Sequence, residues 1–220
     1  DDGEGNTAVG YLALSANCGD HNTAVGSGAL TVCTGQQNTA VGENAGKSVT
    51  SGIQNTFMGV DSGDAITSSN YNVGLGYGAI SLDTLGSRTT AVGTFALDSQ
   101  NFTTATDTHN TAVGYGAGQG ITTGLENTII GGNAGDALTD TDANVAVGAF
   151  ALSGDTLGSR SVAVGHSALT TQNFTTATNT YNVAVGDSAG RAITTGVQNT
   201  LIGGLAGDAL TTGNTNTAVG

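Results

Sequence analysis

One short phrase, repeated along the chain, constrains the fold more than any other feature of the sequence. The pentapeptide Asn-[Thr/Val]-x-[Val/Ile/Met/Leu]-Gly occurs thirteen times in 220 residues, at spacings of 16, 17 or 21, with Thr89 and Ser161 in place of Asn in two copies. The copies begin at Asn6, Asn22, Asn38, Asn55, Asn72, Thr89, Asn110, Asn127, Asn144, Ser161, Asn182, Asn199 and Asn216. Such a period is the signature of a repeat architecture, in which each repeat packs on its neighbours. Positions are counted below from the first residue of each copy.

A longer period lies above the short one. Four units make a cycle of 72 residues that starts at about residue 38, so the copy at Asn38 recurs at Asn110 and again at Asn182. No change of composition interrupts this order. We therefore expect residues 1–220 to form one continuous array.

The length and composition of the unit indicate its structure. Units of 16–21 residues are too short for a helical-hairpin repeat, which needs about 33 or more. Thr, Val and Ile favour strands, whereas Gly and Asn tolerate the positive φ angles of tight corners. The sequence predicts an all-β fold, a parallel β-solenoid (β-roll) of about 13 short coils. The predicted corner and ladder residues are Asn6, Gly10, Asn22, Gly26, Asn38, Gly42, Asn110, Gly114, Asn182 and Gly186.

Alternation along a strand separates positions two and four from position three. Position four is always aliphatic or Met, so we expect that column to face the interior. Position three is usually Ala, but Phe57, Ile129 and Leu201 interrupt it every 72 residues, which suggests that the other side of the strand also meets something. A coil with so few apolar residues encloses a thin core. Association of several chains about one axis, as a homotrimer, would relieve that shortage.

Charge excludes some classes of partner. The chain has 4 Lys and Arg against 17 Asp and Glu, a net charge of −13. Such a surface repels phosphate backbones, so we expect no nucleic-acid binding. No apolar run approaches the roughly 20 residues of a membrane-spanning helix, and we expect no membrane insertion.

The repeated strings resemble two families. Asn6-Thr7-Ala8-Val9-Gly10 and its successors are similar to the head repeat of trimeric autotransporter adhesins, a left-handed parallel β-roll shared by three chains. They resemble more closely the N-T-A-V-G-x-x-A-L arrays of phage tail fibres and related surface proteins, as in Asn6 to Leu14 and Asn22 to Leu30. The resemblance covers essentially the whole chain. It implies a trimeric fibre at a virion or cell surface, and it does not specify a receptor.

Few residues suggest chemistry. Asp64, Asp136 and Asp208 lie in Gly-Asp-Ala-[Ile/Leu] phrases that weakly resemble calcium-binding nonapeptides, and we interpret them as turn carboxylates. The histidines, His21, His109 and His166, have no partners at a spacing suited to metal or acid–base chemistry, and we expect them at the surface. We find no nucleophile elbow or phosphate-binding loop. We expect no enzyme activity, no cofactor and no metal.

Two kinds of covalent modification are predicted. Cys18 and Cys33 occupy similar places in adjacent coils, so an intrachain disulfide is expected in an oxidising compartment, because stacked coils bring such residues close. The extra segments of the 21-residue units carry Asn-Phe-Thr acceptor patterns at Asn101 and Asn173, which are glycosylation candidates; the alternative is a plain polar loop.

The sequence is compatible with three functions. The first is a structural segment of a phage tail fibre or bacterial surface filament, extracellular or on the virion, that serves as a rigid spacer and display surface. The second is an adhesin head that binds a host glycan or matrix protein. The third is an ice-binding solenoid, which a regular Thr array would favour and which Val73, Val145, Val162 and Val183 interrupt.

Overall fold

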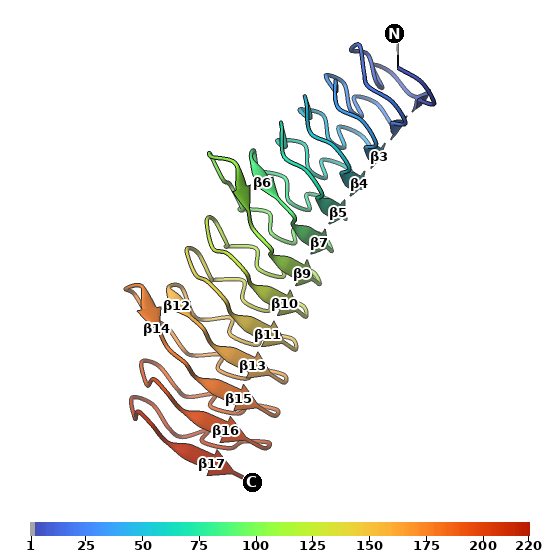
Figure 1. The fold of residues 1–220 in the computed structure, drawn as a ribbon. Helices are drawn as coiled ribbons and strands as arrows, with labels where there is room; N and C mark the ends of the chain where they lie inside the picture. Colours follow the sequence, from blue (N-terminus) through green and yellow to red (C-terminus); the bar gives the residue numbers. More distant parts are fainter. Residues whose placement is uncertain (1–2) are drawn as a thin grey trace. The chain divides into compact units, whose positions relative to one another are not determined.

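The computed structural model describes residues 3–220 and divides the chain into two compact units, Asp1–His109 and Asn110–Gly220. Each unit is a stack of coils in which one short strand per coil pairs in parallel with the equivalent strand of the next coil (Figure 1). Among the described residues there is no helix. The prediction of an all-β, parallel β-solenoid is therefore confirmed.

The first unit contains six three-residue strands that coincide with positions two to four of the repeat. They are β1 (Thr7–Val9), β2 (Thr23–Val25), β3 (Thr39–Val41), β4 (Thr56–Met58), β5 (Val73–Leu75) and β7 (Thr90–Val92). In β1 and β2, Thr7 pairs with Thr23 and Val9 with Val25, so equivalent positions lie directly above one another. A second, two-stranded pair joins β6 (Gly86–Ser87) to β8 (Thr106–Asp107).

The second unit repeats this arrangement with seven such strands. They are β9 (Thr111–Val113), β10 (Thr128–Ile130), β11 (Val145–Val147), β13 (Val162–Val164), β15 (Val183–Val185), β16 (Thr200–Ile202) and β17 (Thr217–Val219). The accessory pair is β12 (Gly158–Ser159) with β14 (Thr178–Asn179). In residues 3–220 the two units together contain thirteen coils, the number that the repeat predicts.

The invariant Gly at position five has a steric cause. Gly42 has a φ of 137°, and a Cβ at this residue would lie 2.5 Å from the carbonyl oxygen of Gly59 in the next coil. Such a φ is essentially restricted to Gly, and the contact with a backbone atom cannot be relieved by a rotamer change. Both the turn after each strand and the close stacking of coils therefore require Gly here.

The interior of each coil is formed by positions three, eight, nine and twelve. In the second coil these are Ala24, Ala29, Leu30 and Cys33, and all four are 0% exposed. Position four instead points outward: Val9 is 58% exposed and no residue of this column is buried. Our assignment of position four to the interior was wrong, because the strand turns position three, which is Ala in most coils, into the core, so that alternation places position four on the outside.

Large and small residues compensate for one another inside the coil. Phe57 at position three is fully buried, and position nine of the same coil is Gly63, where a Cβ would lie 2.3 Å from the Phe57 ring. Where position three is Ala24, position nine is the fully buried Leu30. Phe57, Ile129 and Leu201 therefore fill the interior of their own coils. Our interpretation that this side of the strand meets something beyond the coil was wrong. The argument for a trimer from a shortage of core falls with this finding, because each coil encloses a core of its own.

Candidate functional site

The Asn column at position one forms a ladder of hydrogen bonds inside each unit. The amide oxygen of Asn22 accepts a bond from the backbone N–H of Asn38 at 2.9 Å, and Asn38 acts in the same way on Asn55 at 3.0 Å. The side-chain NH₂ of Asn38 donates to the carbonyl of Gly52 at 2.8 Å. Each of these Asn side chains is fully buried. The column therefore satisfies buried backbone groups of two coils at once, which is a structural role.

The ladder changes where Thr89 replaces Asn. The fully buried carboxylate of Asp83 accepts bonds from the backbone N–H groups of Gly86 and Phe102, both at 3.0 Å, and from the amide of Gln100 at 2.6 Å. Gln100 also donates to the Thr89 hydroxyl at 3.0 Å. This cluster fixes the extra segment of the 21-residue coil. The second unit repeats it with Asp155, Gln172 and Ser161.

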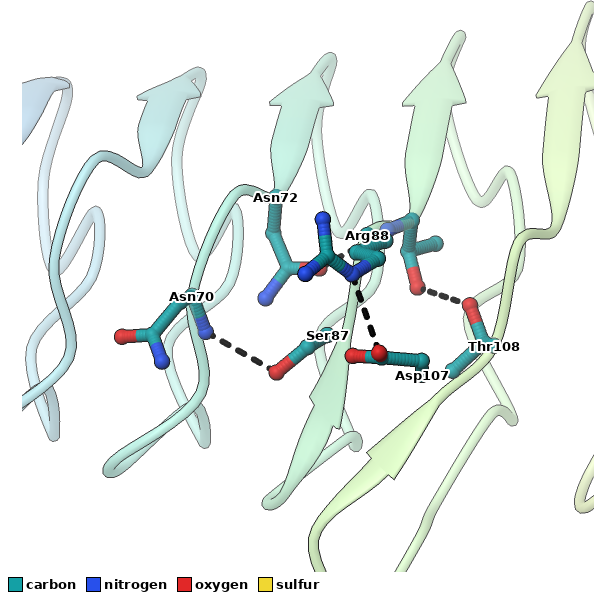
Figure 2. Close-up of polar contacts among 7 residues, drawn as sticks. Asn70, Asn72, Ser87, Arg88, Asp107 and Thr108 are labelled. Atoms are coloured by element: carbon teal, nitrogen blue, oxygen red, sulfur yellow. Dashed lines mark hydrogen bonds and ion pairs between the residues drawn. The ribbon is translucent and has the colours of Figure 1, made fainter.

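Figure 2 shows polar contacts next to this cluster in sequence, with Arg88, Asp107 and Thr108 labelled. The Thr89 hydroxyl is 2.7 Å from that of Thr108, and the guanidinium of Arg88 contacts the carboxylate of Asp107 at 3.0 Å. Both members of the ion pair are about half exposed, so the pair contributes little, about 0–1 kcal/mol. The cluster and these contacts hold a loop in place and offer no open reactive group.

The outward side of the motif strands forms a continuous surface within each unit, here called the strand face: positions two and four of every coil. Position two is Thr or Val throughout and position four is Val, Ile, Leu or Met, so the face carries no charged residue in any coil. Met58 is 49% exposed and Ile202 is 42% exposed. All five tyrosines are exposed and belong to position six or to the residue before position one, next to the strands. They are Tyr11, Tyr71, Tyr77, Tyr115 and Tyr181.

A cavity of about 270 Å³ lies in the first unit. It is lined by three carboxylates, two aromatic rings and small or aliphatic residues: Asp61, Asp64, Tyr77, Gly78, Ser81, Leu82, Phe95 and Asp98. The ring centroids of Tyr77 and Phe95 are 5.2 Å apart at 79°, an edge-to-face pair. The Ser81 hydroxyl donates to Asp98 at 2.5 Å, and the Asn44 amide donates to Asp61 at 3.1 Å. We call this hollow the Tyr77 cavity.

The electrostatics of the Tyr77 cavity are those of crowded acids. Burial raises the pKa of the Asp64 carboxyl, and the neighbouring charge of Asp61 raises it further, while Lys47 and backbone hydrogen bonds act in the opposite direction. The cavity therefore disfavours one more negative charge. None of the residues that line the cavity is basic.

The structure places the other predicted residues as follows. Cys18 and Cys33 are buried free thiols, and burial raises the pKa of the Cys33 thiol; the disulfide stays a prediction. Asn101 and Asn173 are exposed, and their glycosylation also stays a prediction. The histidines His21, His109 and His166 are exposed, and the first two occupy the same corner, directly before the Asn of the repeat.

The three Asp residues of the Gly-Asp-Ala phrases have different surroundings. Asp64 lines the Tyr77 cavity, Asp136 accepts a bond from the Asn133 amide at 3.2 Å, and Asp208 lies at a partly exposed turn. Among residues 3–220, no three His, Cys, Asp or Glu side chains are grouped closely enough to hold a metal ion. No helix in that part of the chain has the length and apolarity needed to cross a bilayer.

Sequence reasoning missed the Tyr77 cavity because its residues come from three coils and from positions six, seven, ten and eleven. The available signal was the offset of 17 residues between coils, which stacks Asp61, Gly78 and Phe95 in one column. Comparison of the chain with protein-family models, with curated proteins and with solved structures found no match.

Proposed function

We propose that this chain is a structural segment of a fibre or filament, extracellular or on a virion, that acts as a rigid spacer and display surface and has no catalytic role. The segment associates as a homotrimer through the strand face. The observation that carries the proposal is the uncharged, partly exposed aliphatic column at position four, which recurs in every coil of a chain with a net charge of −13.

The charge distribution favours self-association at this face. Copies of one chain carry the same net charge and repel one another, so they can approach only where charged residues are missing from the contact. The strand face meets that condition at both of its columns. Burial of its Val, Ile, Leu and Met side chains would contribute roughly 25 cal/mol for each Å² of apolar surface removed from water.

The constant register supports a closed assembly. Equivalent residues lie one strand spacing apart, about 4.8 Å, in every copy, so a contact that forms at one coil can form again at the next. In a three-fold arrangement each strand face turns toward the common axis and contacts both neighbours, which closes the assembly without an open end.

A pair of charge variants tests the proposal. M58K/I130K places two Lys on the strand face, and we expect it to convert the trimer into a monomer in sedimentation velocity at matched concentration. T103K/T175K adds the same charges to exposed residues of the extra segments and should leave the trimer intact. Equal masses for both variants and the unaltered chain would contradict the proposed interface.

Receptor binding is a second candidate function. The exposure of all five tyrosines beside the strands favours it, because Tyr supplies a large contact area at low entropic cost. Binding to a host glycan or matrix protein would be seen on immobilised candidates, and it should fall when Tyr11, Tyr71 and Tyr115 are changed to Ala together.

Ice binding is a third candidate, favoured by the finding that the Thr column at position two faces outward with position four. The four Val residues in that column still interrupt the array. Inhibition of ice recrystallisation by a monomeric chain would replace the fibre proposal, whereas growth of ice crystals at the rate seen in buffer would remove this candidate.

A further inference from the structure

The Tyr77 cavity exists because one coil of the first unit has smaller side chains at two positions than the coils before and after it. In the middle coil, positions seven and ten are Gly78 and Ser81. The same two positions are Asp61 and Asp64 in the preceding coil, and Phe95 and Asp98 in the following coil. The gap is therefore two coil spacings wide, on the order of 10 Å. Its volume of about 270 Å³ suits a small group rather than a polymer segment.

The wall of the cavity accepts hydrogen bonds and carries negative charge. Asp61 and Asp98 each use one oxygen on a neighbouring side chain, and the second oxygen of each can accept a bond from a ligand. No basic residue is in the lining, and Lys47 is the cation that acts on Asp64 from outside it, so an anion would meet an excess of negative charge. A ligand that binds here must supply donors and positive charge.

The aromatic pair adds a second requirement. Tyr77 and Phe95 meet edge to face, at 79°, and both side chains line the cavity. Ring faces attract cations, and the attraction strengthens when water is displaced. Leu82 supplies an aliphatic contact on the same wall.

The arrangement fits an organic cation better than a metal ion. Among the described residues no three acidic, His or Cys side chains converge closely enough to hold a metal, so the carboxylates of the cavity surround a larger volume. Rings and an aliphatic side chain are poor metal ligands but pack well against an alkyl chain.

We propose that the Tyr77 cavity binds the alkylammonium group of a ligand, with the ammonium attracted by the negative charges of Asp61, Asp64 and Asp98 and its alkyl chain against Tyr77, Phe95 and Leu82. A free amine and a lysine side chain of a partner protein carry the same group. The proposal does not depend on the fibre function or on the trimer, since all of the residues belong to one unit of one chain.

The 72-residue cycle provides an internal comparison. In the second unit the equivalents of Gly78, Tyr77, Phe95 and Asp98 are Phe150, Ala149, Ser167 and Thr170. A Phe therefore replaces the Gly, and the other three replacements remove two rings and one carboxylate of the cavity wall. Phe150 has a φ of 58°, close to the 60° of Gly78, so the backbone angle of this corner is compatible with a Phe. A Cβ at Gly78 would lie 3.1 Å from the Phe95 side chain, so that ring must shift when Phe is introduced.

That comparison supplies the variants for a test. We would titrate the ¹⁵N-labelled 220-residue chain with n-butylammonium chloride at constant ionic strength and follow the amides of Gly78 and Ser81. We expect saturable shifts with butylammonium, and no saturable shifts with n-butanol, its neutral counterpart. D64N should weaken binding about tenfold, and D136N, the equivalent change in the second unit, should leave binding unchanged.

Two further variants separate loss of binding from loss of fold. G78F copies the residue found one cycle later and should abolish the shifts while the rest of the spectrum is retained. Y77A should weaken binding roughly three- to thirty-fold. Tighter binding of Nα-acetyl-lysine amide than of butylammonium would indicate that the group comes from a lysine side chain of a partner protein. Tighter binding of butylammonium would indicate that the ligand is a free amine. The proposal would be overturned if n-butanol, or methyl glucoside as a neutral sugar, bound as tightly as butylammonium. Undiminished binding of butylammonium by G78F would overturn it as well.

Discussion

Replacement of Phe57 by Ala tests directly which side of the strand forms the core. Phe57 lies at position three of its coil and is 0% exposed, and it is among the largest fully buried side chains. Its ring lies against Gly63, where even a Cβ would come within 2.3 Å. Truncation therefore leaves a ring-sized void that no neighbour of the same coil can fill.

The magnitude follows from the burial. Phe→Ala substitutions at fully buried sites cost about 3–5 kcal/mol of unfolding free energy. The matched control is F150A: Phe150 is 48% exposed and its removal leaves no void, so we expect a loss of at most about 1 kcal/mol. Both values come from urea unfolding of the two variants, followed by far-ultraviolet circular dichroism at one protein concentration.

A second substitution should restore much of the loss. G63L introduces at position nine the residue that accompanies Ala in the second coil, where Leu30 has a φ of 48°, near the 60° of Gly63. Alone, G63L should destabilise by about 1–3 kcal/mol, because it overlaps the Phe57 ring. Combined with F57A it should stabilise, with a coupling energy of about 1–3 kcal/mol. A loss for F57A no larger than that for F150A, or additive effects in the pair, would refute the packing described here.

Three other outcomes follow from the structure. G42A should cost about 2 kcal/mol or more, from its φ and its contact with the next coil, while G132A, with no atom within 4 Å of its Cβ, should change stability by less than about 0.5 kcal/mol. D83A strands three buried donors and should cost about 3 kcal/mol or more, with earlier protease cleavage of residues 101–107. In reduced protein, Cys18 and Cys33 should react with a thiol reagent only after unfolding, because both thiols are buried. In protein exposed to an oxidant, no reaction in denaturant without reductant would show the predicted disulfide.

The architecture could be predicted from the sequence because the repeat records it directly. The Gly at position five and the Thr and Val before it define a turn and a strand, and thirteen copies define the coils. The choice of face could not be made from hydrophobicity alone, because position three is mostly Ala and position four mostly Val, and both are compatible with a buried side.

The signal for the correct face was present as a size relation within the chain. Every large residue at position three is accompanied by Gly at position nine: Gly63 with Phe57, Gly135 with Ile129 and Gly207 with Leu201. Such compensation is expected only between side chains that share one interior space. The Tyr77 cavity had no comparable signal, because its wall depends on which residues of three successive coils lie next to one another.

Association of the chain through the strand face is tested most directly by the mass of the unaltered chain in solution. Light scattering during size-exclusion chromatography, at several concentrations, should give three times 21.4 kDa and should hold on dilution. A stable mass of 21.4 kDa at every concentration would contradict the trimer and leave the strand face as a surface for some other contact.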